Sequence, residues 1–356
     1  MSTVLAREAF SVGARQYFWR DVVIAAILRG DWRPFAEQVR GGLALVQQAE
    51  DADEAPSDQD LDAAGEEFRY ARDLETAEDM EAWLERWDLT VEDWMGYLER
   101  SLLRESGSED VDQVLARYPP SDADVAENIW TEAVCSGELA RFAETLASRA
   151  ALGERAAASG DDGKDAAPQL GLERFLGTFP DSLAQSGLAE LLGAEPREKL
   201  EELTRLELAF ESVSRHLLTP AAIREQLERN RLDWIRLDLR DVRFASEEAA
   251  REAALCLRQD GEPLETVAAR ARVPVEPSRL HLSEADPDLR AHLLGAQPGQ
   301  LLGPFSLEDG FHLFHVCERT MPSEEDPDFR QLAADALLTG LIERETQSRV
   351  RWHDRL

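Results

Sequence analysis

The spacing of apolar residues changes near residue 231, and this change divides the chain into two kinds of structure. Before it, apolar residues recur every three or four positions, which is the period of an amphipathic helix. From Leu232 to Arg240 they alternate instead, so that Ile235, Leu237 and Leu239 share one face of a strand. A long helical part followed by mixed strands and helices is typical of the α+β class, which we predict for this chain.

Two helices of the first half are marked by their first residues. Thr76 is followed by Ala-Glu-Asp and Thr90 by Val-Glu-Asp, so each hydroxyl can cap free amides while acids stand in the first turn. Their apolar residues fall at helical spacing and predict the core faces of an antiparallel helix pair. These residues are Met80, Trp83, Leu84 and Trp87 in the first helix, and Val91, Trp94, Leu98 and Leu102 in the second. We expect residues 1–48 to be helical as well, and the acidic segment Glu50–Asp60 to be a loop.

The part after residue 231 predicts a small domain with elements in the order β-α-α-β-α-β-β. Its last two strands, Leu301–Leu307 and Phe311–Glu318, are joined at Glu308-Asp309-Gly310, where glycine permits the positive φ of a short hairpin. A closing helix is expected from Phe329 to Trp352.

We therefore expect five consecutive regions. The small polar residues between Ala156 and Pro168 are typical of a flexible linker, so this segment separates two helical parts. The regions are an N-terminal helical region at 1–155, the linker at 156–168, a helical connector at 169–230, the small α+β domain at 231–322, and a C-terminal helix at 323–356 that packs on the helical body.

The charge of the chain excludes two classes of function. There are 72 acidic against 39 basic residues, a net charge of −33, so the chain lacks the clustered cations that nucleic acids or anionic membranes require. Residues 51–150 hold 28 acidic and eight basic residues, a net charge of −20. This stretch is either a solvated acidic surface, which we favour, or a binding surface for a basic partner.

No motif of the chain indicates a cofactor. Cys135, Cys256 and Cys317 are far apart and form no CxxC pair, so neither a disulfide framework nor a zinc ribbon is expected. His312 and His315 would point to opposite faces of a strand, which leaves too few ligands for a metal. Signatures of nucleotide binding and hydrolysis are absent, and the apolar run Val22–Leu28 is too short for a signal peptide or a membrane span. We expect a cytoplasmic protein without metal or cofactor.

Several segments of the chain resemble a known family. The segments Phe244–Ala268, Gly299-Gln-Leu-Leu-Gly-Pro-Phe305 and Gly310-Phe-His-Leu-Phe-His-Val316 resemble the parvulin-type prolyl isomerase domain of SurA-type and PpiC-type chaperones. The segment Phe68–Leu103 resembles the helical part of SurA-type chaperones. The likeness is closest to the parvulin-related proteins that are associated with gene clusters for ribosomal peptide natural products.

The resemblance implies a peptide groove and a damaged catalytic site. His312 matches the histidine near the parvulin active centre, and we take it as the candidate catalytic residue. Leu289, Leu294 and Phe305 would line the proline pocket, with Trp234 closing one side; each of the four also suits a buried core position. The first strand, however, has Asp233-Trp234-Ile235-Arg236 where active parvulins have a histidine, and the glycine-rich middle segment is shortened to Val275–Leu280.

These observations lead to one favoured function and two alternatives. We expect a peptide-binding chaperone or recognition protein for a ribosomally made precursor peptide, with a degenerate isomerase domain whose activity is weak or absent. The alternatives are an active peptidyl-prolyl isomerase for the same kind of peptide and a structural adaptor for a peptide-modifying enzyme. The expected partners are a precursor peptide or an unfolded polypeptide segment, and in addition a peptide-modifying enzyme, but neither nucleic acid nor membrane.

Overall fold

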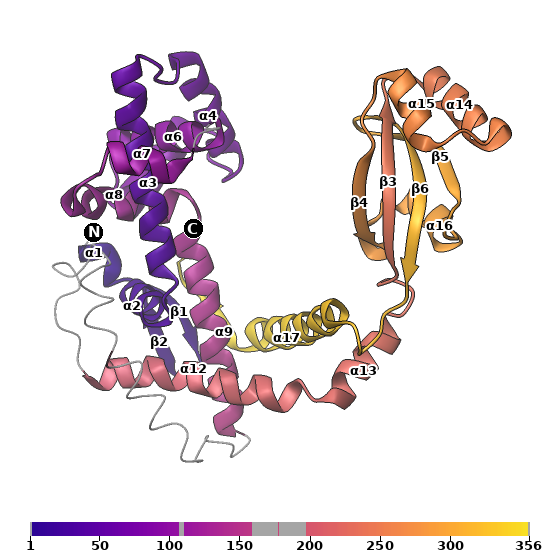
Figure 1. The fold of residues 1–356 in the computed structure, drawn as a ribbon. Helices are drawn as coiled ribbons and strands as arrows, with labels where there is room; N and C mark the ends of the chain where they lie inside the picture. Colours follow the sequence, from indigo (N-terminus) through magenta and orange to yellow (C-terminus); the bar gives the residue numbers. More distant parts are fainter. Residues whose placement is uncertain (1, 107–109, 159–176, 178–196, 355–356) are drawn as a thin grey trace. The chain divides into compact units, whose positions relative to one another are not determined.

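The structure is a computed structural model that describes residues 2–106, 110–158, 177 and 197–354 (Figure 1). It divides into two compact units, which are described separately. Unit 1 comprises Met1–Arg215 together with Leu341–Leu356, and unit 2 comprises His216–Gly340. The expected linker falls largely outside the described residues, although helix continues through Ala158, three residues beyond the expected end of the helical region. No helix among the described residues combines the length and the apolar character that crossing a bilayer demands.

Unit 1 is built from helices around a small sheet. Helices α12 and α17 each begin or end in the other unit. The elements in chain order are α1 (Ser2–Leu5), β1 (Glu8–Val12), β2 (Arg15–Phe18), α2 (Trp19–Arg29), α3 (Trp32–Ala52), α4 (Asp58–Tyr70), α5 (Ala77–Trp87), α6 (Val91–Ser106), α7 (Val111–Arg117), α8 (Asp122–Cys135), α9 (Glu138–Ala158), α12 (Arg197–Leu217), α17 (Pro327–Arg349) and β7 (Val350–Trp352).

The predicted helix caps of unit 1 are confirmed. Thr76 Oγ1 accepts a hydrogen bond from Asp79 N at 3.1 Å, while Asp79 Oδ2 accepts one from Thr76 N at 3.0 Å. Thr90 and Asp93 make the same reciprocal pair. The predicted core face of α5 is buried as expected, but α6 packs mainly against α3, α4 and α8 rather than against α5. Its first residue, Val91, is 53% exposed, so that part of the expected stripe is wrong.

Two expectations for the first 60 residues are wrong. Residues 1–48 are not helical throughout, because β1 and β2 form an antiparallel hairpin, and β7 from the other end of the chain pairs with β1. The acidic loop is confined to residues 53–57, since α3 extends to Ala52 and α4 begins at Asp58. Ser57 and Asp60 cap α4 as Thr76 and Asp79 cap α5, and this local bonding makes helix out of a segment with few apolar residues.

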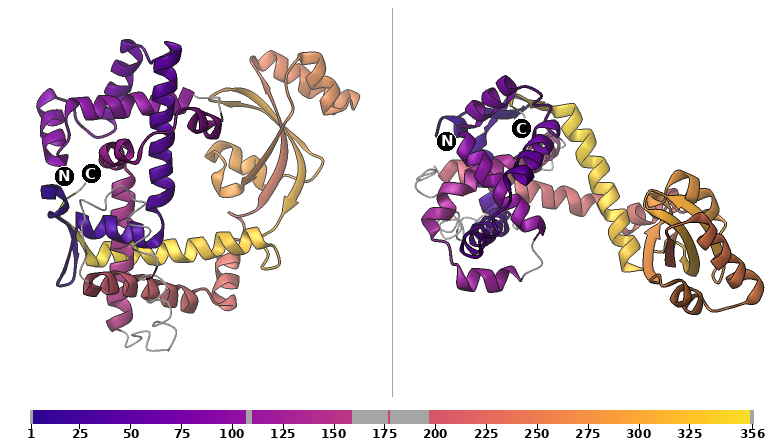
Figure 2. Two further views of the ribbon diagram at one scale, coloured as in Figure 1. Left: turned by 60° about the vertical axis from the view of Figure 1, so that its left-hand side comes forward. Right: turned by 90° about the horizontal axis from the view of Figure 1, so that it is seen from above.

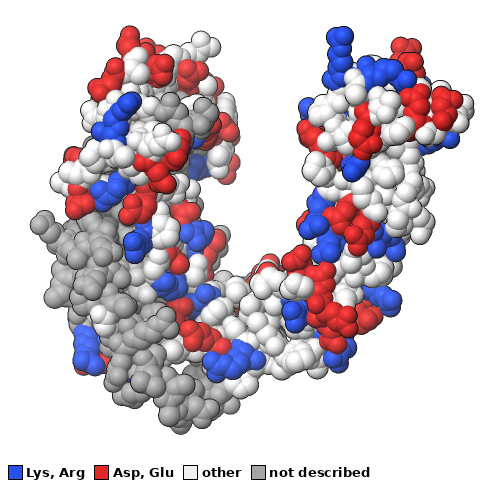
Figure 3. All heavy atoms as spheres, viewed as in Figure 1, with Lys and Arg blue, Asp and Glu red and all other residues white. Residues whose placement is uncertain are grey.

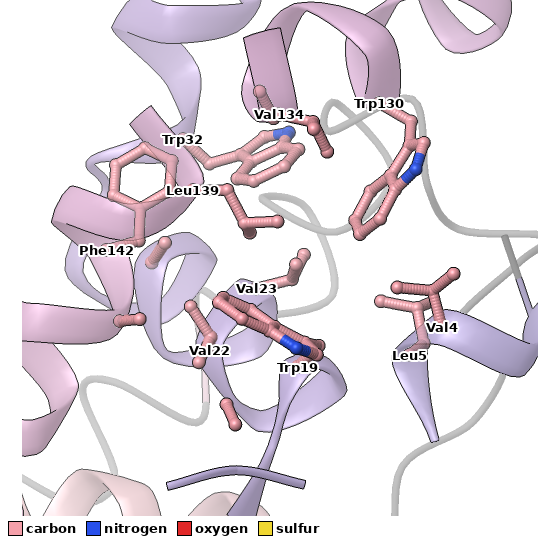
Figure 4. Close-up of a cluster of buried hydrophobic side chains, with 14 of the residues drawn as sticks. Val4, Leu5, Trp19, Val22, Val23, Trp32, Trp130, Val134, Leu139 and Phe142 are labelled. Carbon is pink, nitrogen blue, oxygen red and sulfur yellow. The ribbon is translucent and has the colours of Figure 1, made fainter. Parts of the chain in front are cut away.

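The core of unit 1 is rich in tryptophan. Trp19 and Trp32 are each 1% exposed and lie among side chains of α2, α8 and α9 (Figure 4). Trp130 donates its indole hydrogen to the Trp87 carbonyl at 2.9 Å, which satisfies the polar atom of a buried ring. The core therefore joins helices from α1 to α9, together with Leu203 and Leu206 of α12, into one body.

Many acidic residues of the stretch 51–150 have local structural roles. Asp60, Asp79, Asp93 and Asp124 cap helices, and buried Glu132 accepts from Arg100 Nε at 3.0 Å and also contacts Arg104. In Figure 3 acidic side chains lie at the surface of both units among basic and uncharged ones. These roles favour the interpretation of the stretch as a solvated surface.

Unit 2 has the predicted element order around a four-stranded antiparallel sheet. The strand order is β4-β3-β6-β5, and every pair of neighbours is antiparallel. The elements are α13 (Pro220–Arg229), β3 (Arg236–Phe244), α14 (Glu247–Leu255), the π-helical turn η1 (Cys256–Asp260), α15 (Leu264–Ala271), β4 (Glu276–His281), the 3₁₀ turn η2 (Leu282–Glu284), α16 (Pro287–Leu294), β5 (Leu301–Leu307) and β6 (Gly310–Thr320). The first strand thus begins at Arg236, four residues later than expected, because Leu232–Trp234 form a turn.

The two faces of this sheet are covered by different helices (Figure 2). Leu237 and Leu239 of β3 pack with Leu289 and Leu293 of α16. Farther along β3 the buried residues change parity and hence face, and they pack against α14 and α15. Residues of β6 divide in the same way, which places His312 and Phe314 on the α16 face.

Candidate functional site

A pocket of about 590 Å³ opens in unit 2 between α16 and the end of β5. A pocket of this size is in the range of small-ligand sites and can receive one or two side chains of a peptide. Its apolar part is formed by Leu289, Pro304, Phe305 and Leu307. Its polar part is formed by Asp286, Asp288, His292, Ser306, Glu308 and Asp309. All of these residues belong to α16, to β5 or to the turns next to them.

The sequence builds both walls through local bonds. Asp286 caps α16 by accepting from Asp288 N at 2.9 Å, and Pro287 stands at the first helical position, where its missing amide hydrogen costs nothing. In the other wall, the register of β5 against β6 shifts between Leu302 and Phe305. Gly303 has φ of 101°, and a Cβ there would lie 2.5 Å from the His312 carbonyl oxygen. Only glycine therefore fits this bulge.

Aromatic rings form part of the floor. The Phe305 ring lies 5.1 Å from the His292 ring and 6.1 Å from the Phe314 ring, measured between centroids. Leu289 contributes to the floor but is only 5% exposed, because it also packs into the core between α16 and the sheet. The pocket is therefore lined by the edge of the hydrophobic core rather than by freely exposed side chains.

His312 is buried behind the pocket and bonded on both sides. Its Nδ1 lies 2.9 Å from an Asp241 oxygen, and its Nε2 lies 2.8 Å from Asp309 Oδ1. Carboxylate oxygens thus occupy the hydrogen-bonding positions of both ring nitrogens. The ring then has no nitrogen left for a ligand. His312 is not among the lining residues, but it contacts Asp309 and is the cross-strand partner of Phe305, and both of these residues line the pocket.

The pKa values of the two carboxylates that contact His312 are shifted in opposite directions. The Arg243 guanidinium, 2.7 Å from Asp309, and then His312 hold the pKa of Asp309 below its ordinary value. Burial raises the pKa of Asp241, although its bond to His312 acts in the opposite direction. Near neutral pH Asp309 is therefore firmly ionised and presents a negative charge to the pocket.

The structure brings together only some of the residues expected from the sequence. Leu289 and Phe305 line the pocket, but Leu294 does not and is 41% exposed. Leu294 stands five residues after Leu289, which is about 140° around an α-helix, so the two cannot share a narrow face. Trp234, which was expected to close one side of the pocket, does not line it either. It lies in a separate cluster with Leu227 and Phe329, because β3 begins only after it.

Several lining residues were missed from the sequence. Asp286, Leu289 and His292 are three residues apart, and this spacing brings them to one side of α16. That spacing could have identified His292 as a lining residue. Glu308 and Asp309 stand in a predicted hairpin turn, but no local pattern shows which element the turn will face.

One group among the described residues has the spacing of a metal site. The ligand atoms of Cys256, Asp260 and Glu262 lie within 4.8 Å of one another in and after η1. Arg270 already supplies a positive charge, since its guanidinium lies 3.0 Å from Glu262. We therefore assign this group to the local structure of the turn.

Comparisons with known proteins found similarity only among solved structures. No family model and no curated protein matches the chain, whereas 17 chains of solved structures do. A peptidylprolyl isomerase, PrsA from Bacillus cereus, is 15% identical, with a TM-score of 0.38 over 58% of this chain and 80% of that one. PrsA from Bacillus subtilis is 14% identical, with a TM-score of 0.23 over 62% and 86%. A chain from work on two SurA-like chaperones of Campylobacter jejuni is 12% identical, with a TM-score of 0.18 over 52% and 84%.

The structural neighbours are thus PrsA and SurA-like proteins, at low identity and low TM-score. The site described above rests on the residues of this chain alone.

Proposed function

We propose that this protein binds peptide segments through the pocket of unit 2 and acts as a chaperone or recognition protein for a ribosomally made precursor peptide. The observation that carries the proposal is an open pocket with an apolar, partly aromatic floor and a polar rim. This composition suits a peptide, whose apolar side chain can enter the floor while its backbone meets polar groups at the edge. The proposal includes a cytoplasmic location and weak or absent isomerase activity.

The surroundings of the pocket favour binding over catalysis. Rotation about a peptide bond has a barrier of about 18–20 kcal/mol, and a catalyst must bind the twisted amide more tightly than the planar one. Both nitrogens of His312 are engaged by Asp241 and Asp309, so the ring cannot also donate to a twisted amide. The first-strand segment offers no substitute, because Arg236 pairs with Asp326 at 3.1 Å.

The proposal is tested by peptide binding to the full chain. A fluorescently labelled peptide with a central Leu-Pro step and uncharged neighbours is titrated with protein, and its anisotropy is recorded. Phe305→Ala should weaken binding several-fold, because it removes apolar contact made only in the complex. Leu294→Ala is the matched control, since Leu294 is a partly exposed apolar residue of the adjacent helix and does not line the pocket. Equal affinities of Phe305→Ala and the unmodified protein, with both folded, would reject the proposal.

Prolyl isomerase activity is measured in a separate experiment. Exchange between the cis and trans forms of a proline tetrapeptide is followed by NMR with and without protein. We expect little acceleration. Strong acceleration that is lost in Phe305→Ala would instead establish the alternative function, an active prolyl isomerase.

A further inference from the structure

The rim of the pocket is acidic on two sides. Asp286 and Asp288 stand at the start of α16, and Glu308 and Asp309 stand in the turn between β5 and β6. These elements are separate in the chain, and the fold brings their carboxylates around one apolar floor. The lining includes neither lysine nor arginine, and His292 is its only basic side chain.

Most of these carboxylates are not neutralised by the protein. Asp309 is paired with Arg243 and His312. None of the ion pairs between described residues involves Asp286, Asp288 or Glu308. Asp286 accepts a backbone hydrogen bond as the cap of α16, and this local role accounts for one of the three charges. Glu308 lies on the opposite wall and is exposed, so helix capping does not explain it.

We propose that the pocket selects peptide segments in which arginine or lysine flanks the apolar side chain that enters the floor. This inference rests on the proposed function and names its substrate class. A flanking cation would lie close to carboxylates that lack a cationic partner, whereas a flanking acid would meet like charges from both walls. A neutral segment would bind through the apolar floor and backbone contacts, without a contribution from side-chain charge.

The test uses three labelled peptides that share a central Leu-Pro step and differ only in the neighbours of that step. The neighbours are arginine, glutamine or glutamate. With the full chain at low salt, we expect affinities in the order arginine, glutamine, glutamate. Each flanking charge should change affinity roughly two- to fivefold, as for partly exposed ion pairs. The differences should shrink with added salt, because the screening length falls from about 30 Å at 0.01 M to about 8 Å at 0.15 M.

A charge-neutralising variant tests whether the acidic rim causes the preference for peptides with flanking arginine. Asp288→Asn combined with Glu308→Gln should reduce the ratio of affinities between the arginine and the glutamine peptides. The matched control is Glu248→Gln combined with Glu252→Gln, which removes two exposed acids of α14 on the other face of the same sheet. The control should keep the preference. Glu308→Gln alone is a second variant that leaves the start of α16 intact.

The outcomes separate this inference from the proposed function. If the glutamine peptide binds in a manner that depends on Phe305 but the three peptides bind equally, the charge preference is wrong and the proposed function stands. A preference that survives in the Asp288/Glu308 variant also overturns the inference. If no peptide binds in a manner that depends on Phe305, the proposed function itself fails.

Discussion

Replacement of Leu289 by alanine tests whether this side chain belongs to the hydrophobic core or to the peptide-binding groove. Leu289 is 5% exposed and packs with Leu293 and the β3 leucines. Truncating a buried leucine costs about 2–5 kcal/mol, and the cost rises with the volume of the cavity left behind. Because Leu289 borders an open pocket, water and neighbouring side chains can fill part of that space. We therefore expect the lower part of the range, about 2–3 kcal/mol.

The assay is thermal unfolding of the full chain, followed by circular dichroism. For a unit of the length of His216–Gly340, each kcal/mol moves the midpoint by roughly 3–5 °C, so the expected fall is roughly 6–15 °C for the transition of unit 2. Leu294→Ala is the reference on the same helix. It removes a side chain that is 41% exposed and should lower the midpoint by only a few degrees. A Leu289→Ala midpoint within a few degrees of the unmodified protein, with weakened peptide binding, would refute the assignment of Leu289 to the core.

Three further predictions concern the bulge, the carboxylate beside the pocket and the C-terminus. Gly303→Ala should destabilise unit 2 and weaken peptide binding, as measured by thermal unfolding and anisotropy, because its Cβ would lie 2.5 Å from the His312 carbonyl oxygen. The folded-state pKa of Asp309 is lowered, so its ion pairs stabilise the fold above the unfolded pKa of about 3.9, and this contribution is lost as pH falls through the lower folded pKa. In urea unfolding, Asp309→Asn should thus be less stable than the unmodified protein at pH 7, and the two should converge in strong acid. Buried Asp354 accepts the Trp19 indole hydrogen at 2.9 Å and pairs with arginines, so Asp354→Asn should destabilise unit 1 by about 1–3 kcal/mol in urea unfolding. An unchanged urea midpoint would show that this contact is dispensable.

The catalytic interpretation of His312 shows what a sequence motif can and cannot predict. The hairpin Leu301–Leu307 and Gly310–Thr320 forms where the sequence predicts it, and Gly310 has positive φ as the short turn requires. What His312 does depends on Asp241, 71 residues away in the chain. Asp309, three residues before His312, engages one ring nitrogen locally, but only the pairing of β3 with β6 brings Asp241 to the other.

Local patterns determined the elements of this protein. The caps at Thr76 and Thr90, the order of elements in unit 2 and its closing hairpin were all predictable, because each depends on residues within a few positions of one another. Helix α4, which begins inside the expected acidic loop, also has a local cause. The Ser57–Asp60 cap was present in the sequence but was outweighed by the lack of apolar residues.

Only the tertiary structure decided which elements meet. The two strands of the N-terminal hairpin are close in the chain, but the third strand of their sheet, Val350–Trp352, lies more than 300 residues away, so no local window contains the whole sheet. The pocket has the same origin. Its walls come from α16 and the β5–β6 turn, and the rotation of α16 about its axis turns Leu289 inward and Leu294 outward. Residue type and spacing determine what a helix or strand can present, but the packing of the sheet determines which of those side chains share a site.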